Sequence, residues 1–281
     1  MTISLVSVHG GHSGQFCCHA RDTLEAVVQA YIDKGFAWVG LTEHMPLPAD
    51  RFLYPEERAA GLDVEKMLVR FDAYMAEARR LQACYRDSIE ILVAFETEAC
   101  TGSSPLAARL IEQYQPDYVV GGVHHVDDIP FDYSEQEYNR AVRAAGGLEE
   151  LYCRYFDLQY ELLRELRPAV VAHFDLIRLF DSDYPRRLAL PSVEQRIVRN
   201  LDGIREWGLI LDFNVAALRK GASEPYVSAP VLARAHNMGI PLVPSDDSHG
   251  VDLVGACIQD GIAVLQKLGV DTNWSKPGHC R

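Results

Sequence analysis

The chain has 281 residues, a length that suits one large α/β barrel or two small domains. Hydrophobic residues make up 48% of it and charged residues 24%, which is the composition of a folded globular protein and excludes a disordered chain. The formal net charge of −13 argues against a basic nucleic-acid-binding face and against attraction to anionic membranes, so we expect neither partner.

Short apolar and β-branched runs, each bounded by Gly, Pro or polar residues, predict seven buried parallel strands. In chain order these strands are expected at 3–8, 38–42, 90–95, 118–123, 169–172, 209–213 and 240–243. The stretches that follow them predict helices at 23–34, 64–85, 105–115, 148–166, 193–207, 229–237 and 253–268. This alternation predicts a single-domain α/β barrel over residues 1–281, with a doubly wound open sheet as the alternative.

Local signals refine the ends of these elements. Asp22 is expected to cap the first helix, and Gly35 is expected to end it. Segments 134–147 and 180–191 are expected to be loops over the mouth of the barrel.

The cysteines and the apolar runs indicate the cellular compartment to expect. Seven cysteines form no compact framework, no signal segment is recognisable, and no apolar run approaches the roughly 18 residues of a membrane helix. We therefore expect a cytoplasmic protein with mostly free thiols. The adjacent Cys17 and Cys18 lack the spacing of a zinc knuckle, and the sequence gives no indication of the oligomeric state.

Most of the ten histidines closely follow the end of a predicted strand, and acidic residues accompany them. The candidates are His9, His12, His19, His44, Glu96, His124, His173, Asp247 and His249. The carboxyl ends of barrel strands meet at one rim, so we expect these side chains to converge. Imidazole and carboxylate groups suit zinc, iron and manganese, and an excess over four ligands predicts two or three metal ions.

A lone histidine at a strand end is usually a structural residue, so each position is weighed separately. His236 in a predicted helix and His279 in the C-terminal tail are interpreted as structural. His125 is ambiguous, because its neighbour His124 is the better candidate and adjacent strand residues point apart.

Several short motifs occur in a fixed order along almost the whole chain. They are His9 with His12 and then His19, Thr42-Glu43-His44, Glu96 with Glu98, Gly122 with His124, His173 with Asp175, Asp212 with Asn214 and Arg219, and Ser245-Asp246-Asp247 with His249. In this order they resemble the motifs of the PHP (polymerase and histidinol phosphatase) superfamily, and within it the histidinol-phosphatase group.

The resemblance implies a distorted (β/α)7 TIM-like barrel that hydrolyses L-histidinol phosphate to L-histidinol and phosphate, in histidine biosynthesis. It implies two or three divalent metal ions (zinc, or manganese or iron) held by His9, His12, His19, His44, Glu96, His124, His173, Asp247 and His249. Glu96, Asp247 and His249 are the expected catalytic residues. Arg219, Asn214 and Arg178 are expected to bind the substrate, and Lys220 is a weaker candidate.

Three features depart from the family pattern. The first two histidines are separated by two residues where the family commonly has one, and a bulge at Gly10 and Gly11 could restore their alignment. Glu43 stands where the family usually has Asp. An extra residue in the last motif leaves Asp246 or Asp247 as the ligand, and we expect Asp247, which keeps the one-residue gap to His249.

The sequence leaves open the proton donor, the site for the substrate ammonium and several alternative functions. Glu43, Glu98 and Asp175 could donate a proton to the leaving group or orient ligating histidines. Acidic residues at 127, 128 and 132 could meet the ammonium group of the substrate. The alternative functions are a phosphoesterase for another small ester or nucleotide, an amidohydrolase-like barrel, and a non-catalytic metal-binding barrel.

Overall fold

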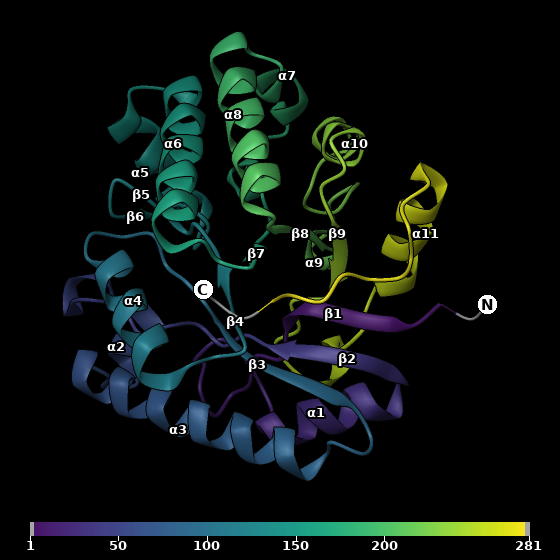
Figure 1. The fold of residues 1–281 in the computed structure, drawn as a ribbon. Coiled ribbons are helices and arrows are strands. Elements are labelled where there is room, and N and C mark those ends of the chain that lie inside the picture. Colours follow the sequence, from purple (N-terminus) through teal and green to yellow (C-terminus); the bar gives the residue numbers. More distant parts are fainter. Residues whose placement is uncertain (1–2, 279–281) are drawn as a thin grey trace.

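A parallel sheet forms the centre of the molecule, with its helices packed around the outside (Figure 1). In the computed structural model, which describes residues 3–278, the sheet has seven strands in the order β1-β2-β3-β4-β7-β8-β9. The strands are β1 (Leu5–Gly10), β2 (Phe36–Leu41), β3 (Glu90–Glu96), β4 (Tyr118–Gly121), β7 (Val170–Val171), β8 (Ile210–Asn214) and β9 (Leu242–Ser245). The seven predicted strands are confirmed, although several end one or two residues away from the predicted positions.

The two edge strands of this sheet approach each other beyond their carboxyl ends. Asp247 N–H donates to the carbonyl of His9 (2.9 Å), and His12 N–H donates to the carbonyl of Ser248 (3.0 Å). These bonds join the ends of β1 and β9, so the sheet is a nearly closed barrel. The open-sheet alternative is wrong, because an open doubly wound sheet would place β1 in its middle rather than against the last strand.

Helices follow most of the strands and cover the barrel. They are α1 (Leu24–Asp33), α3 (Val64–Cys84), α4 (Ser103–Tyr114), α6 (Leu148–Leu166), α8 (Pro191–Trp207), α10 (Ala229–Asn237) and α11 (Ile258–Leu268). Thr23 caps α1, since its hydroxyl accepts from Ala26 N–H at 3.2 Å. The expected cap Asp22 is wrong: it has a φ of 66° and accepts from Val251 N–H instead.

Two segments expected to be loops contain helices. Segment 134–147 contains α5 (Glu135–Ala145), which Ser134 caps through Glu137 N–H at 3.2 Å. Segment 180–191 contains α7 (Tyr184–Leu188). Both helices contact α6, so packing against a neighbour adds to the local stability of these segments.

Short elements complete the fold. They are η1 (Asp50–Phe52), α2 (Pro55–Ala59), the hairpin of β5 (His125–Val126) and β6 (Ile129–Pro130), η2 (Leu176–Arg178), α9 (Ala216–Arg219) and η3 (Val251–Leu253). The helix expected to start at 253 starts later, because Gly255 turns the chain with a φ of 67°. Among the described residues, no helix is both long and apolar enough to cross a bilayer.

Tyrosine hydroxyls tie the strands together inside the apolar core. Tyr74 donates to one strand carbonyl, that of Leu41 or of Ala94, both at 2.7 Å, and Tyr118 donates to the carbonyl of Val8 at 2.6 Å. Gly40 leaves the space for the Tyr118 ring, since a Cβ there would lie 1.6 Å from the Tyr118 hydroxyl. These contacts fix the strand ends that carry the site.

Candidate metal centre

Glu96, the last residue of β3, lies at the centre of the histidine cluster. One carboxylate oxygen is 2.9 Å from His173 Nε2 and 3.0 Å from His124 Nε2. The other is 3.2 Å from both His9 Nε2 and His44 Nδ1. Four strands or their following turns thus deliver histidines to one buried carboxylate, as the barrel geometry predicts.

Asp247 gathers a second set of rings on the β9 side. Its Oδ1 lies 3.4 Å from His12 Nε2, 3.6 Å from His249 Nδ1 and 3.9 Å from His9 Nε2. Asp246 points away from the cavity, because its carboxylate accepts from Ser7, Tyr31 and Gly255 N–H. The geometry therefore places Asp247, and not Asp246, among the histidines.

The extra residue between His9 and His12 is absorbed by the two glycines. The register between β1 and β2 shifts between Ser7 and Gly10, and Gly11 has a φ of 75°. Both rings consequently face the same cluster, with centroids 5.8 Å apart. This is the bulge expected from the sequence.

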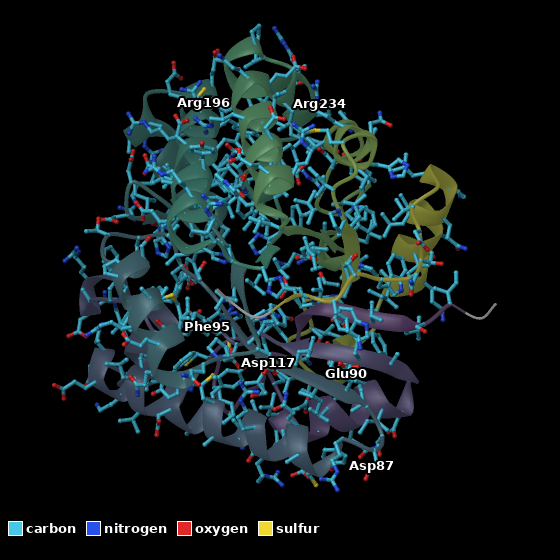
Figure 2. The ribbon with its side chains drawn as sticks, in the orientation of Figure 1. Asp87, Glu90, Phe95, Asp117, Arg196 and Arg234 are labelled. Carbon is cyan, nitrogen blue, oxygen red and sulfur yellow. The ribbon has the colours of Figure 1, made fainter. Side chains whose placement is uncertain are left out.

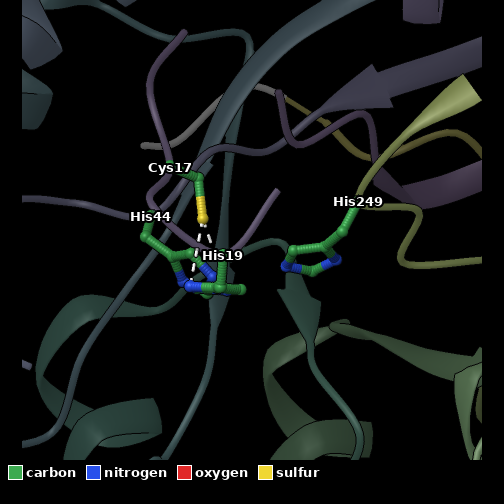
Figure 3. Close-up of side chains that lie close together, drawn as sticks. All are labelled: Cys17, His19, His44 and His249. Atoms are coloured by element: carbon green, nitrogen blue, oxygen red, sulfur yellow. Dashed lines mark hydrogen bonds between the residues drawn. The ribbon is translucent and has the colours of Figure 1, made fainter. Parts of the chain in front are cut away.

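The cluster has an inner and an outer part. We call the inner, mostly buried part the floor group, which consists of His9, His12, Glu96, His124, His173 and Asp247. We call the outer part the mouth group, which consists of Cys17, His19, His44 and His249 (Figure 3). His19 is 48% exposed, whereas His9 and His12 are fully buried.

Several buried ring nitrogens make no hydrogen bond of normal geometry within residues 3–278, even where a carboxylate oxygen of Glu96 or Asp247 lies nearby. They are His9 Nε2, His12 Nε2, both nitrogens of His44, and His173 Nδ1. An unpaired buried polar atom costs about 1–3 kcal/mol, so this many in one place calls for a ligand. Imidazole nitrogens beside ionised carboxylates form the donor set that zinc, iron and manganese prefer, and the residues fit such ions.

Carboxylates behind the rings hold three of these histidines in place. Asp212 lies 3.1 Å from His9 Nδ1, Glu43 lies 3.3 Å from His12 Nδ1, and Asp132 lies 2.8 Å from His124 Nδ1. An acceptor on Nδ1 fixes the tautomer and leaves Nε2 as an electron-pair donor. The sequence reasoning missed this role for Asp212 and Asp132. The signal available for Asp212 was an acidic residue inside an otherwise apolar strand, β8.

The charges of the floor group are strongly coupled. Burial lowers the pKa of His9, but Glu96, Asp247 and Asp212 outweigh it, so the pKa of His9 lies well above its ordinary value. Burial likewise raises the pKa of Glu96, yet the neighbouring histidines bring it well below its ordinary value. The carboxylate therefore stays ionised and able to attract a cation.

The mouth group behaves differently. Burial, followed by the positive charge of His12, holds the pKa values of His44 and His249 well below the ordinary value. Their rings are thus neutral, which is the form that coordinates a metal ion.

The three residues expected to bind substrate are directed elsewhere. Arg178 donates to the carbonyls of Glu224 and Pro225. Arg219 donates to the carbonyls of Asp246 and Asp247, and the Asn214 amide donates to Asp247 Oδ2 at 3.2 Å. None of the three lines the cavity above the cluster. Arg219 and Asn214 support the turn that carries Asp247.

The cavity above the two groups has a volume of about 310 Å³. Its remaining lining includes Lys220, the acidic Glu56 and Glu57, and the rings of Phe16, Tyr54, Tyr133 and Tyr226. Lys220 is the basic side chain that lines the cavity. From the sequence it was a weaker candidate than Arg219 for binding the substrate.

The acidic residues considered for the substrate ammonium separate in the structure. Asp132 lines the cavity. Asp127 pairs with Arg154, and Asp128 accepts from Thr101 N–H at 2.7 Å, so the expectation for these two is wrong. Their hairpin turns them away from the mouth, and α2 supplies Glu56 and Glu57 instead.

The other histidines lie outside the cluster. His125 belongs to the hairpin and lies 3.2 Å from Glu98 Oε2, and it does not line the cavity. His236 lies in α10. His279 is outside the described residues.

Comparisons with known proteins agree on one family. The PHP domain family matches residues 10–216. A Schizosaccharomyces pombe protein named "Probable histidinol-phosphatase" is 39% identical over 94% of this chain and 87% of its own length. The histidinol-phosphatase of Saccharomyces cerevisiae is 31% identical over 89% of this chain and 84% of its own length.

A solved structure shares the fold. Histidinol phosphate phosphatase from Lactococcus lactis, in complex with zinc, L-histidinol and phosphate, superposes with a TM-score of 0.73. It is 17% identical in sequence, and the match covers 96% of this chain and 95% of that one.

Proposed function

Because the chain belongs to the PHP domain family and to its histidinol-phosphatase group, we propose that it hydrolyses L-histidinol phosphate to L-histidinol and phosphate in histidine biosynthesis. The observation that carries this proposal is the Glu96 carboxylate within 3.2 Å of four strand-end histidines, at the bottom of a cavity sized for a small ester.

The activity requires divalent metal ions, for which the two groups supply the donors. We propose two or three ions, zinc or else manganese or iron, held by His9, His12, His19, His44, Glu96, His124, His173, Asp247 and His249. When bound, such ions make a water molecule nucleophilic near neutral pH and offset negative charge on the phosphoryl oxygens. The Lactococcus lactis relative, which holds zinc, supports this choice of metal.

The chain's own residues bind and orient the ester. Lys220 meets the phosphate as a cation at the mouth, while Glu56 and Glu57 offer carboxylates to the substrate's ammonium group. The aromatic rings of Tyr54 and Tyr133, whose centroids are 5.6 Å apart, also line the cavity. A phosphate at the metal end and a cation at the acidic end fix one orientation of the substrate.

Three carboxyl groups were candidates for protonating the leaving group, and Glu98 is the one that lines the cavity. Glu43 accepts from Ser13 N–H and lies against His12, and Asp175 accepts from Ser228 N–H. We therefore assign Glu43 and Asp175 to positioning. Glu96, Asp247 and His249 remain the proposed catalytic residues.

The proposed activity is tested by phosphate release from histidinol phosphate together with metal analysis of the purified protein. We expect kcat/KM for histidinol phosphate to exceed that for a nucleoside monophosphate, because the acidic rim attracts the ammonium group of histidinol phosphate, which a nucleoside monophosphate lacks. Equal turnover of both esters would favour a broader phosphoesterase. Bound metal without cleavage of any ester would favour the non-catalytic barrel. The cytoplasmic location stays a prediction.

A further inference from the structure

The mouth group contains a donor that the expected ligand set does not include. Cys17 is buried, with 6% of its surface exposed, and its Sγ lies 3.2 Å from His19 Nδ1 and 3.3 Å from His19 Nε2. Figure 3 shows the thiol directed at the His19 and His44 rings, with His249 across from them. Potential ligand atoms of all four residues lie within 4.8 Å of one another.

The separation between Cys17 and His19 can be compared with that of two ligands around one ion. In a tetrahedral zinc site, with Zn–S of about 2.3 Å and Zn–N of about 2.0 Å, sulfur and nitrogen ligands lie about 3.5 Å apart. The Cys17–His19 separation is close to this value. In addition, His44 Nε2 is buried and makes no hydrogen bond within residues 3–278, so the imidazole beside the thiol has a ring nitrogen available to a metal ion.

We propose that Cys17 is a metal ligand and that Cys17, His19, His44 and His249 together form a zinc site at the mouth of the cavity, with one sulfur and three imidazole ligands. This inference rests on the metal centre of the proposed function and adds to it a fourth donor of a different chemical kind. When the sulfur–zinc bond forms, the thiol proton leaves to solvent and the thiolate supplies the bonding electron pair.

The thiolate sets the metal preference of this site. Sulfur ligands favour zinc, whereas carboxylate-rich sites also accept manganese. The mouth group would therefore select zinc more strongly than the floor group, which contains Glu96 and Asp247 but no sulfur. A Cys17→Ser variant is expected to weaken zinc binding at the mouth by at least about tenfold and to narrow the preference for zinc over manganese.

Cys18 provides a matched control. It neighbours Cys17 in sequence, but its sulfur accepts from the Arg70 guanidinium at 3.1 Å and belongs to none of the potential ligand groups of the described residues. Cys18→Ser removes the same atom one residue away from the mouth group. Its metal spectra and its activity are expected to match those of the unmodified chain.

X-ray absorption at the zinc edge of the purified, zinc-loaded full chain tests the proposal. We expect a sulfur neighbour at about 2.3 Å, retained in Cys18→Ser and lost in Cys17→Ser. Cobalt loading gives a second measurement: a thiolate-to-cobalt charge-transfer band in the near ultraviolet that follows the same pattern. Because the unmodified chain must show the sulfur signal, the test does not depend on the folding of any variant.

Turnover of histidinol phosphate on the same samples separates the two proposals. Cleavage of the ester without any sulfur neighbour would overturn the role of Cys17 and leave the proposed function intact. The same holds if Cys17→Ser keeps the sulfur signal. A sulfur neighbour that depends on Cys17, in a protein that cleaves no phosphate ester, would support the site and overturn the function.

Discussion

The floor group and the mouth group line one cavity but are held in different ways. The floor histidines sit at strand ends, and three of them rest on a carboxylate behind the ring, such as Asp212 behind His9. The mouth residues sit largely on loops: His19 is 48% exposed, and His249 Nδ1 is 3.0 Å from the backbone carbonyl of Asp247. The side chains of the floor are therefore held in position before any ligand binds, whereas those of the mouth depend more on a bound ligand for their position.

This difference has a chemical consequence. The floor contains the ionised carboxylates of Glu96 and Asp247, while His44 and His249 are neutral rings in a partly open position. The floor thus offers carboxylate oxygens as well as imidazole nitrogens to a metal ion, whereas the mouth offers imidazole nitrogens and, as proposed above, one sulfur. Four measurements test this difference between the floor and the mouth.

Metal removal is expected to have the largest effect. A strong chelator should reduce phosphate release to background, and zinc or manganese should restore it. Because the mouth residues lie on loops and are more exposed, we expect the mouth to lose its ion at a lower chelator concentration than the floor. Metal content and rate measured along one chelator titration test this. Loss of all ions in a single step would remove the distinction, and full activity in the metal-free protein would refute the metal centre.

Substitution of Glu96 comes next. Glu96→Ala is expected to lower kcat by at least about 100-fold, because four histidines lose their shared carboxylate. For His249→Ala we expect a fall in kcat of at least about 100-fold as well, because a metal ligand is lost. Steady-state kinetics with metal analysis measure both. Glu90→Ala is the control: Glu90 begins the same strand, far from its carboxyl end (Figure 2), and pairs with Lys276. Wild-type turnover in Glu96→Ala would contradict the role of the floor.

Loss of a supporting carboxylate should have a smaller effect. Asp212→Asn keeps the size of the side chain but removes the charge behind His9, and we expect metal affinity to fall by about 10–100-fold. Equilibrium dialysis with zinc measures the change. Asp202→Asn, which alters an exposed ion pair with Arg205 on α8, should leave affinity unchanged. An equally small effect of both substitutions would show that the floor does not depend on its supporting carboxylates.

The smallest effect is expected at the rim. Lys220→Ala should raise KM for histidinol phosphate by about tenfold with little change in kcat, because one charge-assisted contact to the phosphate is lost. Lys220→Arg should retain most of the affinity. Lys267→Ala, in the last turn of α11, is the control for a lost positive charge. A fall in kcat without a change in KM would place Lys220 in the chemical step instead.

The strands and most of the helices could be predicted because they depend on local periodicity. The apolar runs of β3 and β8 lie between turn residues. The strands end at Glu96 and Asn214, close to the ends predicted from the sequence. The helix α5 was missed although its sequence carries local helix signals: Ser134 caps it, Tyr138, Ala141 and Ala145 form one buried face, and Gly146 ends it. The convergence of His9, Glu96 and His173 could be expected from strand ends alone, since a parallel barrel brings all of them to one rim.

The sequence was sufficient to predict which residue types gather at that rim, because the strand period and the chain order allow few arrangements of the strands. The tertiary structure decided what each side chain does there. Asp247 and not Asp246 faces the histidines because a positive φ of 46° turns the chain at that point. Arg219 donates to a backbone carbonyl, and Cys17 faces His19. Both contacts depend on how the loops pack, and loop packing produces no periodic pattern in the sequence.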